Sequence, residues 1–428
     1  MKKLLLLLAF VAIGHTSGFA QSCLPEGITF TTQAQIDNFQ ANYPGCTEIE
    51  GDVTISNNWS GNITNLNGLN ALTSIGGALY IEGLQNLTSL SGLDNLTSIG
   101  EYLKIEWTGL STLSGLESLT SIGGNLVINV NNSLVNLTGL DYVTSIGGTL
   151  DIRMNDSLAN LTGLENLSSI TGGLWLQWNS SLTSLTGLDN VSSIKNDVSI
   201  YGTNLINMIG LDNLSSIGGS LMIGGYEGGN LALTSLTGLE GLISIGGYLS
   251  ISSSPLVSLM GLNNLNSIGD GLGISYTALT SLTGLDNIDA GSISDLIIIY
   301  NISLSNCAVQ SMCEYLASPN GTIEIHNNAP GCNSPEEVEA ACDEVSIKSK
   351  CFENDFLLFP NPAGKTVTIS GNNATAIREI VIYNQTGQKV LQSKPVNYTL
   401  DISILRPGMY IVEMVTNHGN LRKKLIVQ

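Results

Sequence analysis

The sequence is poor in basic residues, histidine and proline. It has 15 Lys and Arg against 35 Asp and Glu, and 3 His. Nucleic acids and anionic membranes both need clustered positive charge, so the shortage of cationic side chains argues against either as a partner. Pro255 is the only proline between Gly51 and Ser318. Because proline cannot donate a ladder hydrogen bond, its scarcity favours long continuous β-ladders there.

Long apolar runs are also scarce, and the one present is at the N-terminus. Lys2 and Lys3 precede an apolar stretch that ends in the small residues Gly18 and Ala20. This pattern predicts a secretory signal peptide over residues 1–20, cleaved before Gln21. Cys23 would suit a lipoprotein, but the residues before it make a poor lipobox. We expect no transmembrane segment in the mature chain.

Groups that do acid–base or nucleophilic chemistry are few. Between Gly51 and Ser318 the basic residues are Lys104, Arg153 and Lys195, and the body's one histidine is His326. Catalysis needs convergent acids and bases, so we expect no catalytic residues, no cofactor and no enzyme. The three histidines are scattered along the chain, so we also expect no metal site.

What the sequence does contain is a repeat. A Gly-Leu step recurs with spacings of 24, 23, 24, 24, 24, 23, 28, 23 and 23 residues, at Gly68, Gly92, Gly115, Gly139, Gly163, Gly187, Gly210, Gly238, Gly261 and Gly284. Each unit continues through a Gly-rich corner into a short Leu-x-Ile segment such as Leu126–Ile128. A fixed period of this length predicts a solenoid, whose turns bury their apolar sides against their neighbours.

The apolar runs are too short for helices and are separated by turn-forming glycines. The sequence therefore predicts a mainly β protein: a parallel β-solenoid of about ten to twelve turns of 23–24 residues, with disulfide-stapled helical caps and a small C-terminal β-sandwich. The expected parts are the signal peptide (1–20), N-terminal cap (21–50), repeat solenoid (51–305), C-terminal cap (306–345), linker (346–355) and a separate C-terminal domain (356–428).

The cysteines lie only at the ends of the solenoid, as expected for stapled caps in an exported chain. Cys23 and Cys46 bracket a capping box at Thr32–Gln35 and are predicted to pair. A second short helix is predicted over 306–316. Cys307–Cys332 with Cys313–Cys342 is one of several pairings there, and Cys351 is left odd.

Charge separates the body from the C-terminal domain. Residues 21–351, here called the body, hold five of the basic and 30 of the acidic residues, a net charge of −25, whereas residues 352–428, the tail, have a net charge of +3.

Eight body acids follow a Gly-Leu step directly, namely Asp94, Glu117, Asp141, Glu165, Asp189, Asp212, Glu240 and Asp286. We expect them to accept backbone N–H groups in their corners, with an amide ladder from the next residue; a weak divalent-cation row is the alternative.

The outward positions of the Leu-x-Ile strands vary from turn to turn. Candidate ligand-binding residues there, or close by, are Tyr80, Trp107, Arg153, Trp175, Trp178 and Tyr201. A regular scaffold with one irregular face is how repeat proteins present binding surfaces. The alternative is that these aromatic side chains pack on adjacent turns and cover the sheet.

The tail resembles the C-terminal sorting domain of the type IX secretion system of Bacteroidetes. The matching segments are Phe359–Pro362, Ile382–Gln388, Leu400–Leu405, Gly408–Tyr410 and Lys423–Leu425, which include Pro360, Asn361, Gly387 and Lys424. The resemblance implies the type IX secretion machinery as a partner and a location outside the cell, released or attached to its outer surface. Residues 23–342 resemble receptor L-domain and leucine-rich-repeat-like surface proteins of the same bacteria.

Together these features predict a non-catalytic surface binding or adhesion protein that uses its outward face. A glycan is the first ligand class to test and a partner protein the close competitor. A structural surface-layer or matrix protein is the main alternative. A polysaccharide-active enzyme and an ice-binding protein are less favoured; Ser168, Ser192, Ser215, Ile243 and Asn266 break the threonine column of Thr73, Thr97, Thr120 and Thr144 that ice binding would use.

Overall fold

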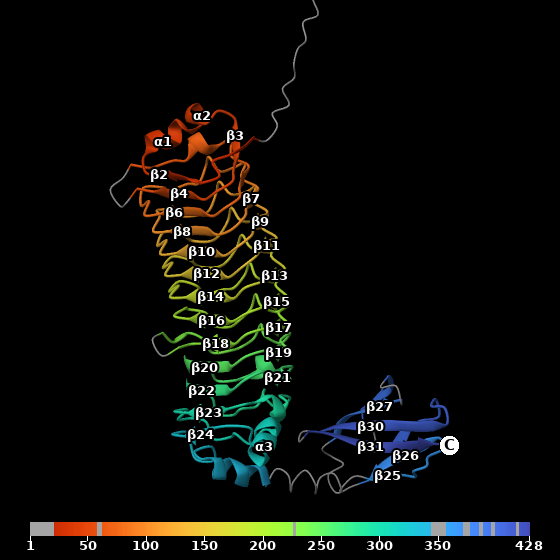
Figure 1. Cartoon of the computed structure of the whole chain (residues 1–428). Helices are drawn as coiled ribbons and strands as arrows, with labels where there is room; N and C mark the ends of the chain where they lie inside the picture. The colour runs from red at the N-terminus through yellow and green to blue at the C-terminus, as the bar shows by residue number, and fades with distance from the viewer. Residues whose placement is uncertain are drawn as a thin grey trace, which may run out of the picture. The chain divides into compact units, whose positions relative to one another are not determined.

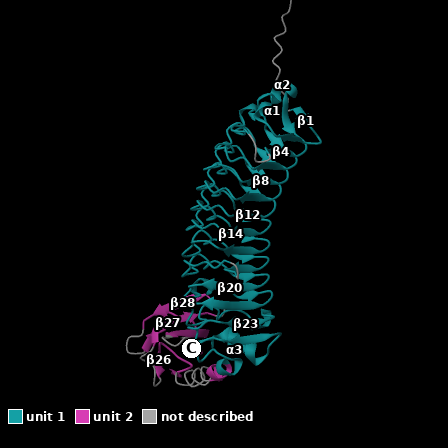
Figure 2. Cartoon of the chain, turned by 90° about the vertical axis from the view of Figure 1, so that its left-hand side faces the viewer, with its two compact units in different colours: residues 1–338 teal, residues 339–428 magenta. Residues whose placement is uncertain are grey.

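The computed structural model describes residues 21–57, 62–225, 228–343, 357–370, 377–384, 388–394, 399–416 and 419–428. It divides into two compact units, residues 1–338 and 339–428 (Figure 2). The predicted signal peptide, the predicted linker, Cys351 and Gly387 lie outside the described residues.

Unit 1 is a parallel β-solenoid with one sheet of longer strands and one of very short strands (Figure 1). In the described part of the chain the long-strand sheet has 13 strands. They are β2 (Ile28–Phe30), β4 (Val53–Ser56), β6 (Leu79–Glu82), β8 (Leu103–Glu106), β10 (Leu126–Asn129), β12 (Leu150–Arg153), β14 (Leu174–Gln177), β16 (Val198–Tyr201), β18 (Leu221–Ile223), β20 (Leu249–Ser254), β22 (Leu272–Thr277), β23 (Leu296–Ile299) and β24 (Ile323–His326).

The short-strand sheet has 11 strands over the same described ranges, most of them a Ser-Ile pair. They are β1 (Gln21–Cys23), β3 (Cys46–Ile49), β5 (Ser74–Ile75), β7 (Ser98–Ile99), β9 (Ser121–Ile122), β11 (Ser145–Ile146), β13 (Ser169–Ile170), β15 (Ser193–Ile194), β17 (Ser216–Ile217), β19 (Ser244–Ile245) and β21 (Ser267–Ile268). The predicted β-solenoid and its number of turns are therefore confirmed.

Side-chain alternation along each long strand builds the core. In β10, Leu126 and Ile128 are fully buried while Val127 and Asn129 stay half-exposed. The register pairs Leu126 with Leu150 and Ile128 with Ile152 on the next turn, so equivalent aliphatic side chains stack in columns. Each turn thus buries its apolar side chains against its two neighbours.

The Gly-Leu step forms one corner of each turn, here named the Gly-Leu corner. At Gly139 the backbone has φ +114°, a conformation that favours glycine. A Cβ atom added at Gly139 would lie 2.2 Å from the carbonyl oxygen of Leu113 on the preceding turn. Glycine is therefore required both by the backbone conformation and by the close stacking of the turns.

The N-terminal cap contains α1 (Gln33–Asp37) and α2 (Phe39–Asn42). The predicted capping box is present, because Thr32 accepts from the Gln35 backbone N–H and Gln35 reaches back to the N-cap backbone. Ile36 and Phe39 are fully buried beneath it. Cys23 and Cys46 form the predicted disulfide, with Cα atoms 5.7 Å apart.

The C-terminal cap differs from expectation in where its helix starts. The helix α3 covers Gln310–Ala317, not 306–316. Asn306 forms a parallel β-bridge with Ser281, and Val309, the N-cap residue, is extended. These residues are therefore not helical, and the helix begins at Gln310. Cys307 pairs with Cys332, and Cys313 and Cys342 are also disulfide-bonded.

Unit 2 consists of two antiparallel sheets, which confirms a small β structure in the tail. One sheet contains β25 (Leu357–Phe359), β26 (Thr366–Ser370) and β29 (Thr399–Asp401); the other contains β28 (Lys389–Ser393), β27 (Ile377–Tyr383), β30 (Gly408–Thr416) and β31 (Gly419–Val427). Their inward side chains share one apolar core, in which Val367, Ile382 and Leu425 are fully buried. Among the described residues, no helix has both the length and the apolar character that spanning a membrane requires.

Candidate binding surface on the long-strand sheet

The outward face of the long-strand sheet has two columns of side chains set by the strand register. The first runs through Tyr80, Lys104, Val127, Asp151, Trp175 and Ser199, each paired with the next. The second runs through Glu82, Glu106, Asn129, Arg153, Gln177 and Tyr201 in the same pairings. Inward positions of these strands are aliphatic, so chemical variety is confined to the outward side.

Strands β12 and β14 bring Arg153 and Trp175 together. The Arg153 guanidinium lies over the Trp175 ring at 4.6 Å from its centroid, and its Nε is 2.6 Å from Asp151 Oδ1. A cation over an aromatic face is attracted by the ring quadrupole. One face of Trp175 is therefore covered by an ion-paired arginine.

Strands β14 and β16 hold a second set of contacts. Gln177 Nε2 donates to Ser199 Oγ at 3.0 Å, and the Tyr201 hydroxyl donates to Gln177 Oε1 at 2.9 Å. The Trp178 and Tyr201 rings meet edge to face, with centroids 5.8 Å apart. Gln177 and Ser199 are buried, so the Tyr201 hydroxyl is held by a buried hydrogen-bonded pair.

We name these seven residues, Asp151, Arg153, Trp175, Gln177, Trp178, Ser199 and Tyr201, the central cluster. Four predicted candidates fall within it. Trp107, which follows β8, lies three strands away from β14, about 14 Å at the usual strand spacing. Tyr80, on β6, is one strand farther. The six candidates thus do not form one contiguous surface.

Charges near the cluster are paired. Lys104 bridges Glu82 and Glu106 at 3.0 Å each. Burial lowers the pKa of the Lys104 ammonium, but its hydrogen bonds to Glu106 and Glu82 outweigh burial and leave that pKa raised. Burial raises the pKa of the Asp151 carboxyl, and the Arg153 guanidinium opposes that rise. Two of the body's few cations are therefore held by acids before any ligand arrives.

The column of acids at the Gly-Leu corners has a structural role, as predicted. In all eight corners the carboxylate accepts the backbone N–H of the glycine two residues earlier, at 2.6 to 3.0 Å. The corners of Gly68 and Gly261 have Asn in place of the acid and instead form the short 3-10 helices η1 (Asn67–Leu69) and η2 (Met260–Leu262). The described residues contain no cluster of three potential metal ligands.

The asparagines three residues after the corner glycines do not form the predicted amide ladder. Each donates instead to a backbone carbonyl of the preceding turn, as Asn166 does to Asp141 at 2.6 Å. Asn95, Asn190, Asn213, Asn264 and Asn287 repeat this contact. The corner is exposed, so the Asn side chain can reach the main chain of the preceding turn. A backbone carbonyl there is an acceptor with two lone pairs, and the Asn Nδ2 donates to it.

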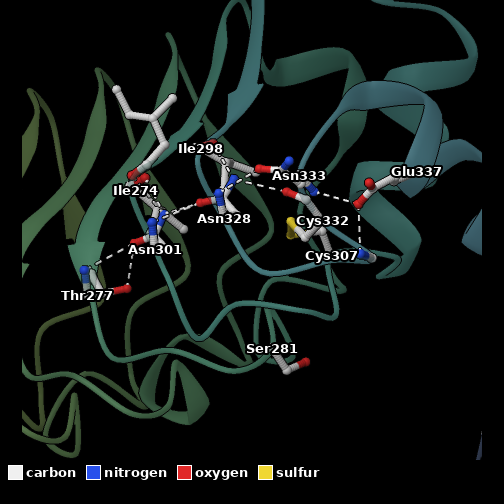
Figure 3. The surroundings of a disulfide bond; sticks show 12 residues. Ile274, Thr277, Ser281, Ile298, Asn301, Cys307, Asn328, Cys332, Asn333 and Glu337 are labelled. Atoms are coloured by element: carbon white, nitrogen blue, oxygen red, sulfur yellow. Dashed lines mark hydrogen bonds between the residues drawn. A yellow bond between two sulfur atoms is a disulfide. The ribbon is translucent and has the colours of Figure 1, made fainter.

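A buried amide ladder does exist, at a position that sequence reasoning missed. It lies three residues after the isoleucine or leucine that ends most of the Leu-x-Ile motifs, and this corner is named the ladder corner. Asn155 is fully buried; its Oδ1 accepts the Asn131 backbone N–H at 2.9 Å and its Nδ2 donates to the carbonyl of Ile128 at 2.8 Å. Figure 3 shows the last rungs, in which Thr277 donates to Asn301 and Asn301 to Asn328.

The residue before most ladder positions adopts a left-handed backbone. Trp107, Val130, Met154, Trp178, Ser253, Tyr276, Tyr300 and Asn327 have φ between 48° and 57°. Bulky residues seldom adopt this conformation, which costs about 1–2 kcal/mol each. The ladder therefore holds a column of large side chains outward; Trp107, Met154, Trp178, Tyr276 and Tyr300 are all at least 40 % exposed. The periodic Asn was the signal that could have located this column.

The sorting-domain candidates that the structure describes lie along its last strand. Asn361 Nδ2 donates to the carbonyl of Lys424, and the Ile426 N–H donates back to Asn361 Oδ1. The Tyr410 hydroxyl donates to the Arg406 carbonyl. The segment with Pro360 and Pro362 is thereby tied to the C-terminal strand, and Gly408 begins the strand beside it.

Comparisons with known families match two parts of the chain. Residues 357–428 match the Secretion system C-terminal sorting domain, and residues 45–106 match the Receptor L domain. A comparison with curated proteins finds no match. The sorting domain implies the type IX secretion machinery as a partner and places the chain outside the cell, secreted or attached at the outer surface.

Proposed function

We propose that this exported β-solenoid, with its receptor L domain and type IX sorting domain, is a non-catalytic surface adhesion protein that binds a partner protein through the central cluster. The observation that carries the proposal is the set of Trp, Tyr and Arg side chains on β12, β14 and β16, which contact one another before any partner binds. These three residue types dominate the binding energy of protein interfaces.

The geometry of the cluster favours a protein over a glycan at this position. Arg153 covers a face of Trp175. A Cβ at Gly202 or at Gly228 would come within 3.0 Å of the Trp178 ring, so backbone already packs against that ring. Stacking on a sugar needs an open ring face, which both tryptophans lack in part. A mixed surface of ring edges, a guanidinium and amides suits a protein interface.

Preorganisation supports the same conclusion. The hydrogen bonds from Gln177 to Ser199 and from Tyr201 to Gln177 fix side chains that would otherwise lose rotamer freedom on binding. Each side chain immobilised in advance lowers the entropic cost of association by roughly 0.5–1.5 kcal/mol.

The test is binding of the labelled mature chain to intact cells that have been treated either with a protease or with periodate, which oxidises sugars. We expect protease treatment to abolish binding and periodate to leave it unchanged. A Trp175→Ala, Tyr201→Ala double variant should lose most binding, whereas Tyr102→Ala, an exposed tyrosine outside the cluster, should retain it.

Two results would contradict the proposal. Binding that survives protease but not periodate would assign a glycan ligand to the surface. Absence of binding to every cell type tested would favour the structural role in a surface layer or matrix. Circular dichroism of each variant would show that the solenoid is folded.

A further inference from the structure

A separate aromatic feature lies nearer the C-terminal end of the ladder-corner column. Tyr276, at the end of β22, and Tyr300, after β23, stack face to face with centroids 5.0 Å apart and planes 5° from parallel. Tyr276 and Tyr300 are 51 % and 41 % exposed. His326 on β24 meets Tyr300 edge to face at 5.8 Å and supports the pair.

A groove of about 600 Å³ opens beside Tyr276. Its described lining includes Leu231, Ser253, Ser254, Tyr276 and Ile302. None of these residues carries a charge. The volume lies within the range of about 300–1,000 Å³ that is usual for small-molecule sites.

The open face of Tyr276 follows from the residues at equivalent positions. Tyr276 lines the groove and Tyr300 does not, so Tyr300 supports the ring from behind. On the preceding turn the equivalent left-handed residue is Ser253, whose small side chain leaves space where other turns carry Trp, Met or Tyr. The groove is therefore a gap in the column, with an aromatic ring face on one side.

The surroundings of the groove combine apolar surface with hydroxyl groups. Leu231 and Ile302 are 81 % and 84 % exposed at its border, and apolar surface gathered at a groove is typical of a ligand site. Ser254 is 4 % exposed and its hydroxyl has no hydrogen-bond partner in the described part of the chain. A ligand that carries both C–H faces and hydroxyl groups matches this lining.

We propose that the groove binds a neutral saccharide, with one pyranose ring against the open face of Tyr276. The C–H face of a sugar packs on an aromatic ring while its hydroxyls bond to groups at the rim. The described lining residues are uncharged and offer no partner for a carboxylate or sulfate, and the body charge of −25 repels acidic sugars. The site uses none of the central-cluster residues, so it is independent of the protein-binding proposal.

The experiment is isothermal titration calorimetry of the mature chain with cellohexaose, laminarihexaose and mannohexaose, and with trigalacturonic acid as an acidic comparison. At least one neutral hexasaccharide should bind with a Kd below about 1 mM. Tyr276→Ala should weaken binding at least tenfold, as expected when a stacking ring is removed. Tyr276→Phe keeps the ring and should stay within about threefold of the wild-type chain. Tyr142→Ala, an exposed tyrosine at a Gly-Leu corner, should bind as the wild type does.

Three outcomes would overturn the proposal. They are no binding of any neutral hexasaccharide, equal binding by the Tyr276→Ala variant, and equal or tighter binding of trigalacturonic acid. The Tyr276→Phe variant separates loss of the ring from loss of folding, because it removes only the hydroxyl. The Trp175→Ala, Tyr201→Ala variant of the cell-binding test keeps Tyr276, so periodate-sensitive binding that survives in this variant is assigned to the groove and not to the central cluster.

Discussion

The Gly-Leu corner and the ladder corner use opposite means to reverse the chain. At eight Gly-Leu corners the residue with positive φ is glycine, and an acid two residues later accepts its N–H. At the ladder corner the residue with positive φ is usually large, and a buried amide or hydroxyl supports it. At the Gly-Leu corner the residue type suits the left-handed backbone conformation, whereas at the ladder corner it does not. The strained corner is also where exposed aromatic rings gather, a pattern that points to binding rather than to folding.

The largest loss of stability in this comparison is expected for Gly139→Ala, at a Gly-Leu corner. Alanine would need φ near +114° and its Cβ would overlap the Leu113 carbonyl. We expect the free energy of unfolding to fall by about 3 kcal/mol or more, measured by urea denaturation. Gly291→Ala is the control, because its nearest contact is 3.3 Å, to the movable side chain of Asp289. A loss for Gly139→Ala no greater than that of the control would show that the corner can rearrange.

The next test removes a ladder amide. Asn155→Ala deprives the Asn131 N–H of its acceptor and removes one donor from the carbonyls of Ile128 and Arg153, although Arg153 keeps the Val130 N–H. Each buried group left unpaired costs about 1–3 kcal/mol, so we expect a loss of about 3 kcal/mol by chemical denaturation.

The matched control is Asn166→Ala, whose exposed amide makes one contact, to the Asp141 carbonyl. It should cost less than about 1 kcal/mol. Equal losses in the two variants would mean that burial does not distinguish the two asparagine columns.

The smallest and most specific test compares glycine with alanine at Met154. Both substitutions remove the same side chain, but only glycine favours φ near 53°. We expect Met154→Gly to be at least as stable as Met154→Ala, by up to about 1 kcal/mol, in thermal and urea unfolding. At the ordinary strand position Val127, glycine should be the less stable by about 0.5–1 kcal/mol. The same order at both positions would indicate that the ladder corner carries no strain.

Much of the fold could be predicted because the residues that determine it recur at a nearly fixed spacing along the sequence. The Gly-Leu spacing indicated the solenoid, the acids after it indicated the corner contacts, and Cys23 and Cys46 bracketed the first cap. Each of these features is local, or is repeated often enough for its period to be read directly.

The candidate site could be predicted only in part because its contacts join different turns. The position of Arg153 over Trp175 depends on the register of β12 and β14, which brings residues 22 apart into contact. The left-handed backbone of Trp178 has no signal in its own residue type. Its signal lies in the following Asn179, which matters only when it is compared with Asn131 and Asn155 at the same place in other turns. Helix α3 was placed too early because the Asn306 bridge is a tertiary contact.

One turn is longer than the rest: Gly210 and Gly238 are 28 residues apart. The extra residues enter between Ile223 and Asn230, yet Asn230 is fully buried, accepts from Thr203 and donates to the Ile200 carbonyl at 2.8 Å. The stack therefore continues through an insertion without a change of register. The segment before the ladder residue can therefore hold an inserted loop while the remaining turns keep their geometry. Variation of loop length at this corner would change the exposed surface and leave the scaffold intact.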